Sequence, residues 1–280
     1  LAPAQPHGNK MQHSVSSQHA LDQAIALSPA GDDTFIGHTS PAYANMVGLF
    51  GGIIAATLLN AVMKHPARLG EPVSQTVHYA APVADGEFTV TARAMRTNRS
   101  TQHWLVELRQ DEQVAAYATA VTGLRRDTWS ATDASFPAVP PANSIEPTPP
   151  LSFAVWTKRY EMRFVEGGPH DQPGAEYPSR TTVWLRDQPP RALDFPSLAS
   201  LCDAFFPRIF LRRQRRAPIG TVVLTTFFHV DAGQLRTLGS HHVLGVARGL
   251  HYGKGFFDQS AEIWSADSVM LASSHQMVYF

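Results

Sequence analysis

The sequence predicts an α+β fold made of two copies of one unit, each a long antiparallel sheet wrapped around a central apolar helix. Three observations support this prediction. An apolar helix-like stretch followed by several alternating strands occurs twice along the chain. A proline-rich stretch separates the two occurrences, and 280 residues leave room for two units of roughly 120 residues each.

The first unit is expected at residues 19–135, after an N-terminal tail of residues 1–18 in which Met11 is a candidate for the natural start. Its helix is predicted by residues 53–63, which follow Phe50-Gly51-Gly52 and are apolar nearly all round, as in a helix enclosed by a sheet. Alternating β-branched and aromatic residues then predict four strands, at residues 73–80, 88–96, 104–108 and 114–122.

Six prolines between residues 137 and 150 predict a linker at residues 136–153, because each proline removes a backbone donor and fixes φ. The second unit, at residues 154–280, repeats the pattern of the first. A helix is expected from about residue 198 to residue 213. Strands are expected at residues 160–164, 181–185, 221–229, 243–250, 255–264 and 269–279.

Composition excludes several classes of protein. Lys plus Arg equals Asp plus Glu at 23 each, so the chain lacks the basic surface of a general nucleic-acid binder. The single cysteine, Cys202, excludes an intramolecular disulfide and fits a reducing compartment, which makes cytoplasm the expected location. The longest apolar run, residues 47–63, falls short of the roughly 20 residues that span a bilayer, so no membrane span is expected.

A carboxylate, a hydroxyl and a carboxamide in the second unit are the candidate catalytic groups. Asp203 follows Leu201-Cys202 and precedes Ala204-Phe205, and such apolar surroundings raise a carboxyl pKa, which keeps the group a competent base near neutrality. Thr221 and Gln276 offer the donor and acceptor together that an attacking water needs.

Each of these three residues also has a structural interpretation: a hydrogen-bonded aspartate, an ordinary strand threonine and an amide on an edge strand. The first unit carries Asn60 at the place of Asp203 and Val121 at the place of Gln276. Asparagine cannot act as a base and valine cannot hold a water. The sequence therefore predicts one catalytic site per chain.

Residues 200–207, 220–229 and 269–276 contain these candidates, and in this order they resemble the type II acyl-CoA thioesterases, the double-hotdog family. Phe50-Gly51-Gly52 also resembles the start of that family's first helix. One position departs from the family pattern, because Val223 stands where an Asp often follows the catalytic Thr by two residues.

The resemblance implies a double-hotdog fold and hydrolysis of an acyl-CoA thioester to a free acid and coenzyme A, without a metal or another cofactor. It assigns Asp203 as the base, and Thr221 and Gln276 as the groups that hold the water. It also implies acyl-CoA as the substrate partner, and we expect the chain to form a homo-oligomer through its sheets.

Two further sets of residues are candidates for substrate binding. Backbone N–H groups of Gly51 and Gly52 at a helix N-terminus could bind the thioester oxygen as charge develops on it, although the glycines could equally serve only helix start and packing. A run of arginines just after the Asp203 helix is either solvated surface or a contact for the phosphates of coenzyme A. The run consists of Arg208, Arg212, Arg213, Arg215 and Arg216, and the last four are the candidates for binding coenzyme A.

Two other functions stay open at this point: a non-catalytic acyl-CoA or lipid binder, and a hotdog enoyl-CoA hydratase. Asp33 and His38 have the spacing of a hydratase pair, but they precede the first helix, which makes a chance match the better interpretation. His241, His242 and His251 lack a metal-ligand spacing. Cys202 is interpreted as a packing residue.

Overall fold

The computed structural model describes residues 18–169, 171, 179–215 and 217–280. The predicted tail, apart from Gln18, lies outside these residues. The first half begins with three small elements, α1 (Ala20–Ala24), β1 (Ser28–Pro29) and β2 (Thr34–His38), which the sequence did not predict. There follow the 3-10 helix η1 (Pro41–Tyr43), α2 (Gly51–Lys64), β3 (Glu71–Tyr79), β4 (Glu87–Thr97), β5 (Thr101–Gln110) and β6 (Gln113–Gly123).

The second half follows two further 3-10 helices, η2 (Ala142–Ser144) and η3 (Val155–Arg159). It contains β7 (Tyr160–Glu166), β8 (Thr181–Asp187), α3 (Phe195–Leu201), α4 (Arg208–Arg213), β9 (Gly220–Phe228), α5 (Ala232–Leu238), β10 (Val243–Arg248), β11 (Tyr252–Gly253), β12 (Phe256–Trp264) and β13 (Met270–Tyr279). The predicted strands of both halves are therefore present, with ends that differ by a few residues.

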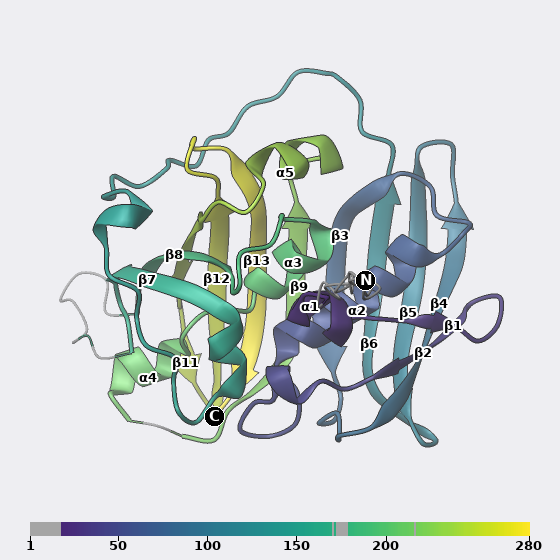
Figure 1. Cartoon of the computed structure of the whole chain (residues 1–280), viewed down its shortest axis with the longest axis horizontal. Coiled ribbons are helices and arrows are strands. Elements are labelled where there is room, and N and C mark those ends of the chain that lie inside the picture. The colour runs from purple at the N-terminus through teal and green to yellow at the C-terminus, as the bar shows by residue number, and fades with distance from the viewer. Residues whose placement is uncertain (1–17, 170, 172–178, 216) are drawn as a thin grey trace, which may run out of the picture.

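Within the described residues, 13 strands form one antiparallel sheet in the order β1-β2-β4-β5-β6-β3-β9-β13-β12-β10-β8-β7, with β11 paired to β12 (Figure 1). The halves join where β3 pairs with β9. Across this junction the hydroxyl oxygens of Thr76 and Thr225 are 3.0 Å apart. The prediction of an α+β double hotdog with a continuous sheet is confirmed.

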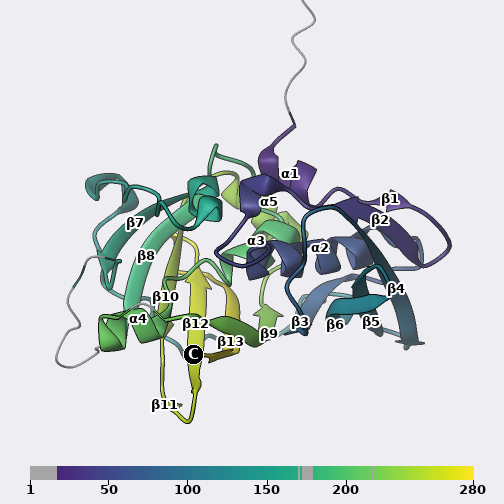
Figure 2. The same ribbon diagram turned by 90° about the horizontal axis from the view of Figure 1, so that it is seen from below.

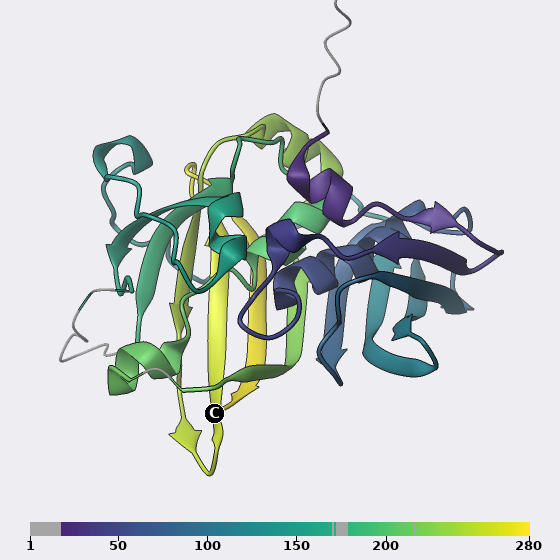
Figure 3. The same ribbon diagram turned by 60° about the horizontal axis from the view of Figure 1, so that its bottom comes forward.

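Helices α2 and α3 lie beside each other on the inner face of the sheet (Figures 2 and 3). Ten of the 14 residues of α2 are buried, which agrees with its apolar character on every side. Gly52 lets the two helices approach closely, because a Cβ on it would lie 2.6 Å from the carbonyl oxygen of Ser200. The helices of the two halves therefore meet in the middle of the molecule.

The prediction of a single helix over residues 198–213 is wrong. Helix α3 ends at Leu201 and α4 begins at Arg208, with a turn between them. Pro207 is the N-cap of α4, and the residue before a proline is disfavoured in the α region, so a continuous helix is unfavourable here. In the turn, the N–H of Phe205 donates to the carbonyl of Asp203 at 2.9 Å. Asp203 therefore lies after the helix and not on it.

The predicted linker, residues 136–153, contains no strand and a single short 3-10 helix, η2. It passes over the sheet from the first half to the second (Figure 1). The indole N–H of Trp184 donates to the carbonyl of Pro140 at 2.9 Å, and the N–H of Thr148 donates to the carbonyl of Met162 at 2.8 Å. These bonds fix the linker on the second half. The division into units at these boundaries stays a prediction.

Candidate active site

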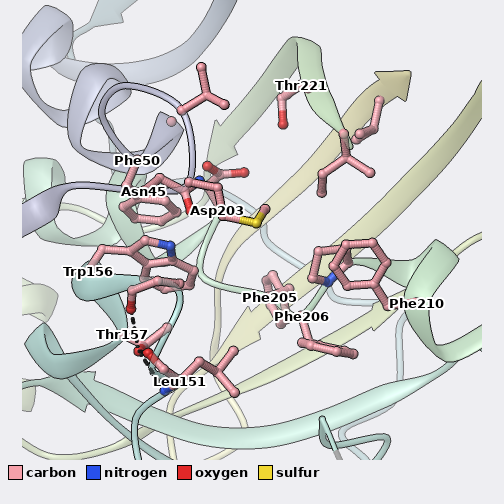
Figure 4. Close-up of a pocket in the computed structure, with 18 of the residues that line it drawn as sticks. Asn45, Phe50, Leu151, Trp156, Thr157, Asp203, Phe205, Phe206, Phe210 and Thr221 are labelled. Atoms are coloured by element: carbon pink, nitrogen blue, oxygen red, sulfur yellow. Dashed lines mark hydrogen bonds between the residues drawn. The ribbon is translucent and has the colours of Figure 1, made fainter. Parts of the chain in front are cut away.

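A cavity of about 720 Å³ opens where the two halves and the linker meet. Its walls come from the N-terminus of α2, the loop after β3, the end of the linker, the turn between α3 and α4, and strands β9, β12 and β13. Most of the lining is apolar. Figure 4 shows Asp203 beside Phe50 at the start of α2, with Thr221 nearby and aromatic side chains such as Trp156 and Phe205 around them.

Asp203 is held against the first turn of α2. One of its carboxylate oxygens, Oδ2, lies 2.7 Å from the place that a Cβ on Gly51 would occupy. The carboxylate accepts hydrogen bonds from the N–H of Gly52 and from the side chain of Gln276. Burial raises the pKa of Asp203 to about 7, and these two hydrogen bonds oppose the increase. The side chain is thus partly ionised at neutral pH, as a general base requires.

Gln276 connects Asp203 to Thr221. Its residue pairs with Leu224 of β9 on one side and with Gln259 of β12 on the other, so the sheet fixes its position. The hydroxyl of Thr221 donates to Oε1 of Gln276 at 3.3 Å. Because Oε1 is an acceptor here, the amide nitrogen is the group that donates to Asp203. The three predicted residues therefore meet at one place, and all of them line the cavity.

The two glycines of α2 differ in their surroundings. Gly51 lines the cavity, whereas the N–H of Gly52 is engaged by Asp203. The N-cap residue Phe50 supplies no side-chain hydrogen bond to the helix. Among the described residues, the N–H of Gly51 has no hydrogen-bond acceptor, which leaves it as the free donor at this helix N-terminus.

The arginines of the predicted run differ in their exposure to solvent. Arg212 and Arg213 end α4 and are exposed, as is Arg215, while Arg216 lies outside the described residues. The segments on both sides of this run line the cavity, through Phe210 and through residues 217–221. The exposed arginines thus lie close to the cavity along the chain.

Arg208 is fully buried, unlike the arginines that follow it. Its guanidinium donates to Oε1 of Gln259 at 3.0 Å and to the carbonyl of Ser179 at 2.8 Å. It also bonds to the hydroxyl of Thr181 and the carbonyl of Phe206. Burial lowers the pKa of Arg208 to about 9. This residue anchors the start of α4 and is not part of a solvated surface.

Sequence reasoning missed two contributors to the site. The hydroxyl of Tyr79, on the last residue of β3, donates to the carbonyl of Gly51 at 3.0 Å. Trp156 stacks on Phe50, with ring centroids 4.1 Å apart, and so closes the cavity with a residue from beyond the linker. A tyrosine at the end of a strand and a tryptophan after prolines are ordinary in sequence, and no motif distinguishes them.

The remaining candidates lie away from this chemistry. Oδ1 of Asp33 is 3.0 Å from Nε2 of His65, and Nε2 of His38 is 3.4 Å from Glu87, so Asp33 and His38 each have another partner. Burial raises the pKa of Cys202 to about 12, which keeps its thiol protonated. In the part of the chain that the structure describes, no group of His, Cys, Asp and Glu side chains is arranged to hold a metal ion. No described helix is long and apolar enough to cross a membrane.

Comparison with models of known protein families identifies the family of this chain. The acyl-CoA thioesterase N-terminal domain matches residues 40–123, and the acyl-CoA thioesterase C-terminal domain matches residues 136–280. The chain therefore belongs to the acyl-CoA thioesterase family, and the resemblance to its type II, double-hotdog members is confirmed. No match was found among curated proteins.

Solved structures agree with this assignment of the fold. A hot dog fold protein of unknown function from Alicyclobacillus acidocaldarius is 44% identical, with a TM-score of 0.90 over 94% of this chain and 98% of that one. An acyl-CoA thioesterase II from Mycobacterium marinum is 17% identical, with a TM-score of 0.75 over 93% and 97%. The tesB protein of Mycobacterium avium subspecies paratuberculosis is 18% identical, with a TM-score of 0.76 over 93% and 98%.

Proposed function

We propose that the protein hydrolyses acyl-CoA thioesters to a carboxylic acid and coenzyme A, with a water activated by Asp203. The observation that supports this most strongly is the arrangement of Asp203, Gln276 and Thr221 at the wall of an apolar cavity, with the pKa of Asp203 raised by burial to about 7. Membership of the acyl-CoA thioesterase family favours a thioester as the substrate.

In the first step a water lies between Asp203 and Thr221. The hydroxyl of Thr221 donates to Gln276, so its oxygen is left to accept a hydrogen bond from the water. Asp203 takes the proton as the water oxygen attacks the thioester carbonyl carbon, and the carbonyl electron pair moves to its oxygen. Gln276 keeps the two side chains at a fixed separation.

In the second step the tetrahedral intermediate collapses and the carbon–sulfur bond breaks. The sulfur leaves as the thiolate of coenzyme A and accepts the proton that Asp203 carried. The products are the free acid and the thiol, and Asp203 returns to its ionised form. A carboxyl with a pKa near 7 serves both directions of this proton transfer.

The oxyanion requires hydrogen-bond donors that are already oriented. The N–H of Gly51 at the N-terminus of α2 is the candidate, because Gly51 lines the cavity and its N–H has no acceptor among the described residues. Gly52 instead directs its N–H at Asp203. The two glycines therefore take different roles in this proposal: one binds the oxyanion and the other orients the base.

The acyl group would occupy the apolar part of the cavity, between Leu151, Trp156 and Phe205. The phosphates of coenzyme A would lie outside, toward the exposed Arg212, Arg213 and Arg215, and Arg216 is assigned the same role. Guanidinium groups suit phosphate because they donate in pairs.

An acyl-CoA panel with a thiol-trapping reagent tests the proposal. A thioesterase releases free coenzyme A from saturated acyl-CoA, and Asp203→Asn should lower the rate of release at least about 100-fold. A hydratase would consume only the absorbance of an enoyl-CoA, and a binder would do neither. Either of these results, obtained with folded protein across the panel, would contradict the proposed function.

A further inference from the structure

Tyr79 lies against the first turn of α2 without belonging to the group of three residues described above. Its hydroxyl donates to the carbonyl of Gly51 at 3.0 Å, and its ring lies 3.4 Å from the place that a Cβ on Gly51 would occupy. Burial and the negative charge of Asp203 raise the pKa of Tyr79 well above its usual range. The hydroxyl therefore stays protonated, and remains a donor, around neutral pH.

The carbonyl of Gly51 and the N–H of Gly52 are the two ends of one planar peptide group. Tyr79 holds the carbonyl end, and Asp203 accepts a hydrogen bond from the N–H end. A hydrogen bond to the carbonyl of an amide polarises the same amide and strengthens donation by its N–H. The hydroxyl of Tyr79 and the carboxylate of Asp203 are thus coupled through a single peptide.

The first turn of α2 needs such a support from outside the helix. It begins with two glycines, which have the greatest backbone freedom, and its N-cap Phe50 provides no side-chain hydrogen bond. The carboxylate oxygen Oδ2 of Asp203 is only 2.7 Å from the Cβ position at Gly51, so a small rotation of this turn would change the contact.

We propose that Tyr79 is a positioning residue that fixes the Gly51–Gly52 peptide, so that the Gly52 N–H is directed at Asp203. This inference rests on the proposed function only for its effect on catalysis. The coupling between Tyr79 and Asp203 is a property of the protein without substrate, and it can be measured in a protein that hydrolyses nothing.

The direction of the effect follows from the hydrogen bonds. The Gly52 N–H stabilises the ionised form of Asp203 and so lowers its pKa. Tyr79→Phe removes the bond at the other end of the peptide and weakens this donor. The titration midpoint of Asp203 should then rise by about 0.5 to 1 pH unit, which corresponds to about a 3- to 10-fold change in the ionisation equilibrium.

The experiment follows the Asp203 carboxyl by NMR in protein labelled with 13C-aspartate, from pH 5 to pH 9, with Asp203→Asn used to assign the signal. Tyr79→Phe should shift the midpoint upward. Tyr43→Phe is the matched control, because Tyr43 is a buried tyrosine outside the cavity lining whose hydroxyl has no partner among the described residues, and it should leave the midpoint unchanged. An unchanged midpoint in folded Tyr79→Phe would overturn the proposal.

A fluorinated tyrosine at position 79 provides a second test in case Tyr79→Phe fails to fold. The more acidic phenol is a stronger donor of almost the same size, so the midpoint of Asp203 should fall. A midpoint that stays constant, or that rises, would overturn the proposal. If thioesterase activity is found, the acid limb of the kcat profile should move with the NMR midpoint in both variants. If the midpoints move without any activity, the positioning role stands and the proposed function fails.

Discussion

The pKa of the Asp203 carboxyl depends strongly on the surroundings of the residue. Its pKa is raised by burial, and the opposing groups are an amide side chain and a backbone N–H, both of which are neutral. The sequence predicted the increase from the apolar neighbours of Asp203. It could not predict the contact with α2, because Gly52 is about 150 residues away along the chain and the two meet only after the halves associate.

Replacing Asp203 should change activity and stability in different ways. Asp203→Asn should lower kcat at least about 100-fold with little change in KM, because the variant lacks the base but keeps the shape of the site. Because the pKa of Asp203 is raised in the folded state, the protein should lose stability as pH rises from about 4 through about 7. The variant should therefore have a higher Tm than the parent protein at pH 8 and a similar Tm at pH 4. Substantial remaining turnover would exclude Asp203 as the base.

Asp187 is a second carboxyl whose pKa is raised by burial, and the proposed mechanism does not use it. The hydroxyl of Ser197 donates to Oδ2 of Asp187 at 2.6 Å, while Oδ1 is buried without a hydrogen-bond partner among the described residues. Burial raises the pKa of Asp187 to about 6. The folded state therefore favours the protonated carboxyl, and stability should be lost as pH rises from about 4 through about 6.

Asp187→Asn should remove this loss. The increase of about two pH units in the pKa of Asp187 corresponds to at most about 3 kcal/mol of unfolding free energy at pH 8. Urea unfolding at pH 4 and pH 8, in an Asp203→Asn background to remove the other raised carboxyl, measures the difference. A variant less stable than its parent at pH 8 would show that ionised Asp187 stabilises the fold.

At the scale of single elements, strands were easier to predict than the second helix. Buried and more exposed residues alternate along β3, β9 and β13, because one face of the sheet is directed at the helices and the other at solvent. A sequence shows this pattern directly as a period of two residues. The helix prediction over residues 198–213 failed because composition favoured helix on both sides of Pro207. The turn between α3 and α4 directs Asp203 toward the cavity. The wrong helix prediction therefore concerns the site itself.

Helix α4 and the loop after it give a prediction about coenzyme A. If Arg212, Arg213 or Arg215 contacts its phosphates, replacing that residue with Ala should raise KM for an acyl-CoA about 5-fold, the scale of one exposed ionic contact, and leave kcat unchanged. A short pantetheine thioester, which lacks the nucleotide, should be affected less. Arg99→Ala, at an exposed arginine in the turn between β4 and β5, is the control. Equal effects on both substrates would assign the run to solvated surface.

For the whole molecule, the repeated pattern was sufficient to predict two similar units and a continuous sheet. The cavity could not be predicted, because its walls come from the linker, from two loops and from both halves at once. Residues such as Trp156 contribute through their position in space, and the sequence holds no periodic signal for that. The cytoplasmic location and the homo-oligomer stay predictions.

The two halves are alike in fold and different in chemistry, which predicts one working site per chain. Asn60 lies within α2, outside the cavity lining, and its amide nitrogen donates to the carbonyl of Ile25 at 2.7 Å. It therefore has a structural role in the first half. Asn60→Asp should create no second site, because a carboxylate there would face a carbonyl in place of a water and a substrate.

Titration with a non-hydrolysable acyl-CoA analogue measures the number of sites. Binding should saturate at one equivalent per chain in the parent protein and in Asn60→Asp, and the double variant Asp203→Asn, Gln276→Ala should hydrolyse nothing. The cavity needs the glycine turn of α2 from the first half and Asp203 from the second, and each chain has one such pairing at the junction of β3 and β9. Two equivalents of tight binding, or turnover by the double variant, would mean that the first half carries a site of its own.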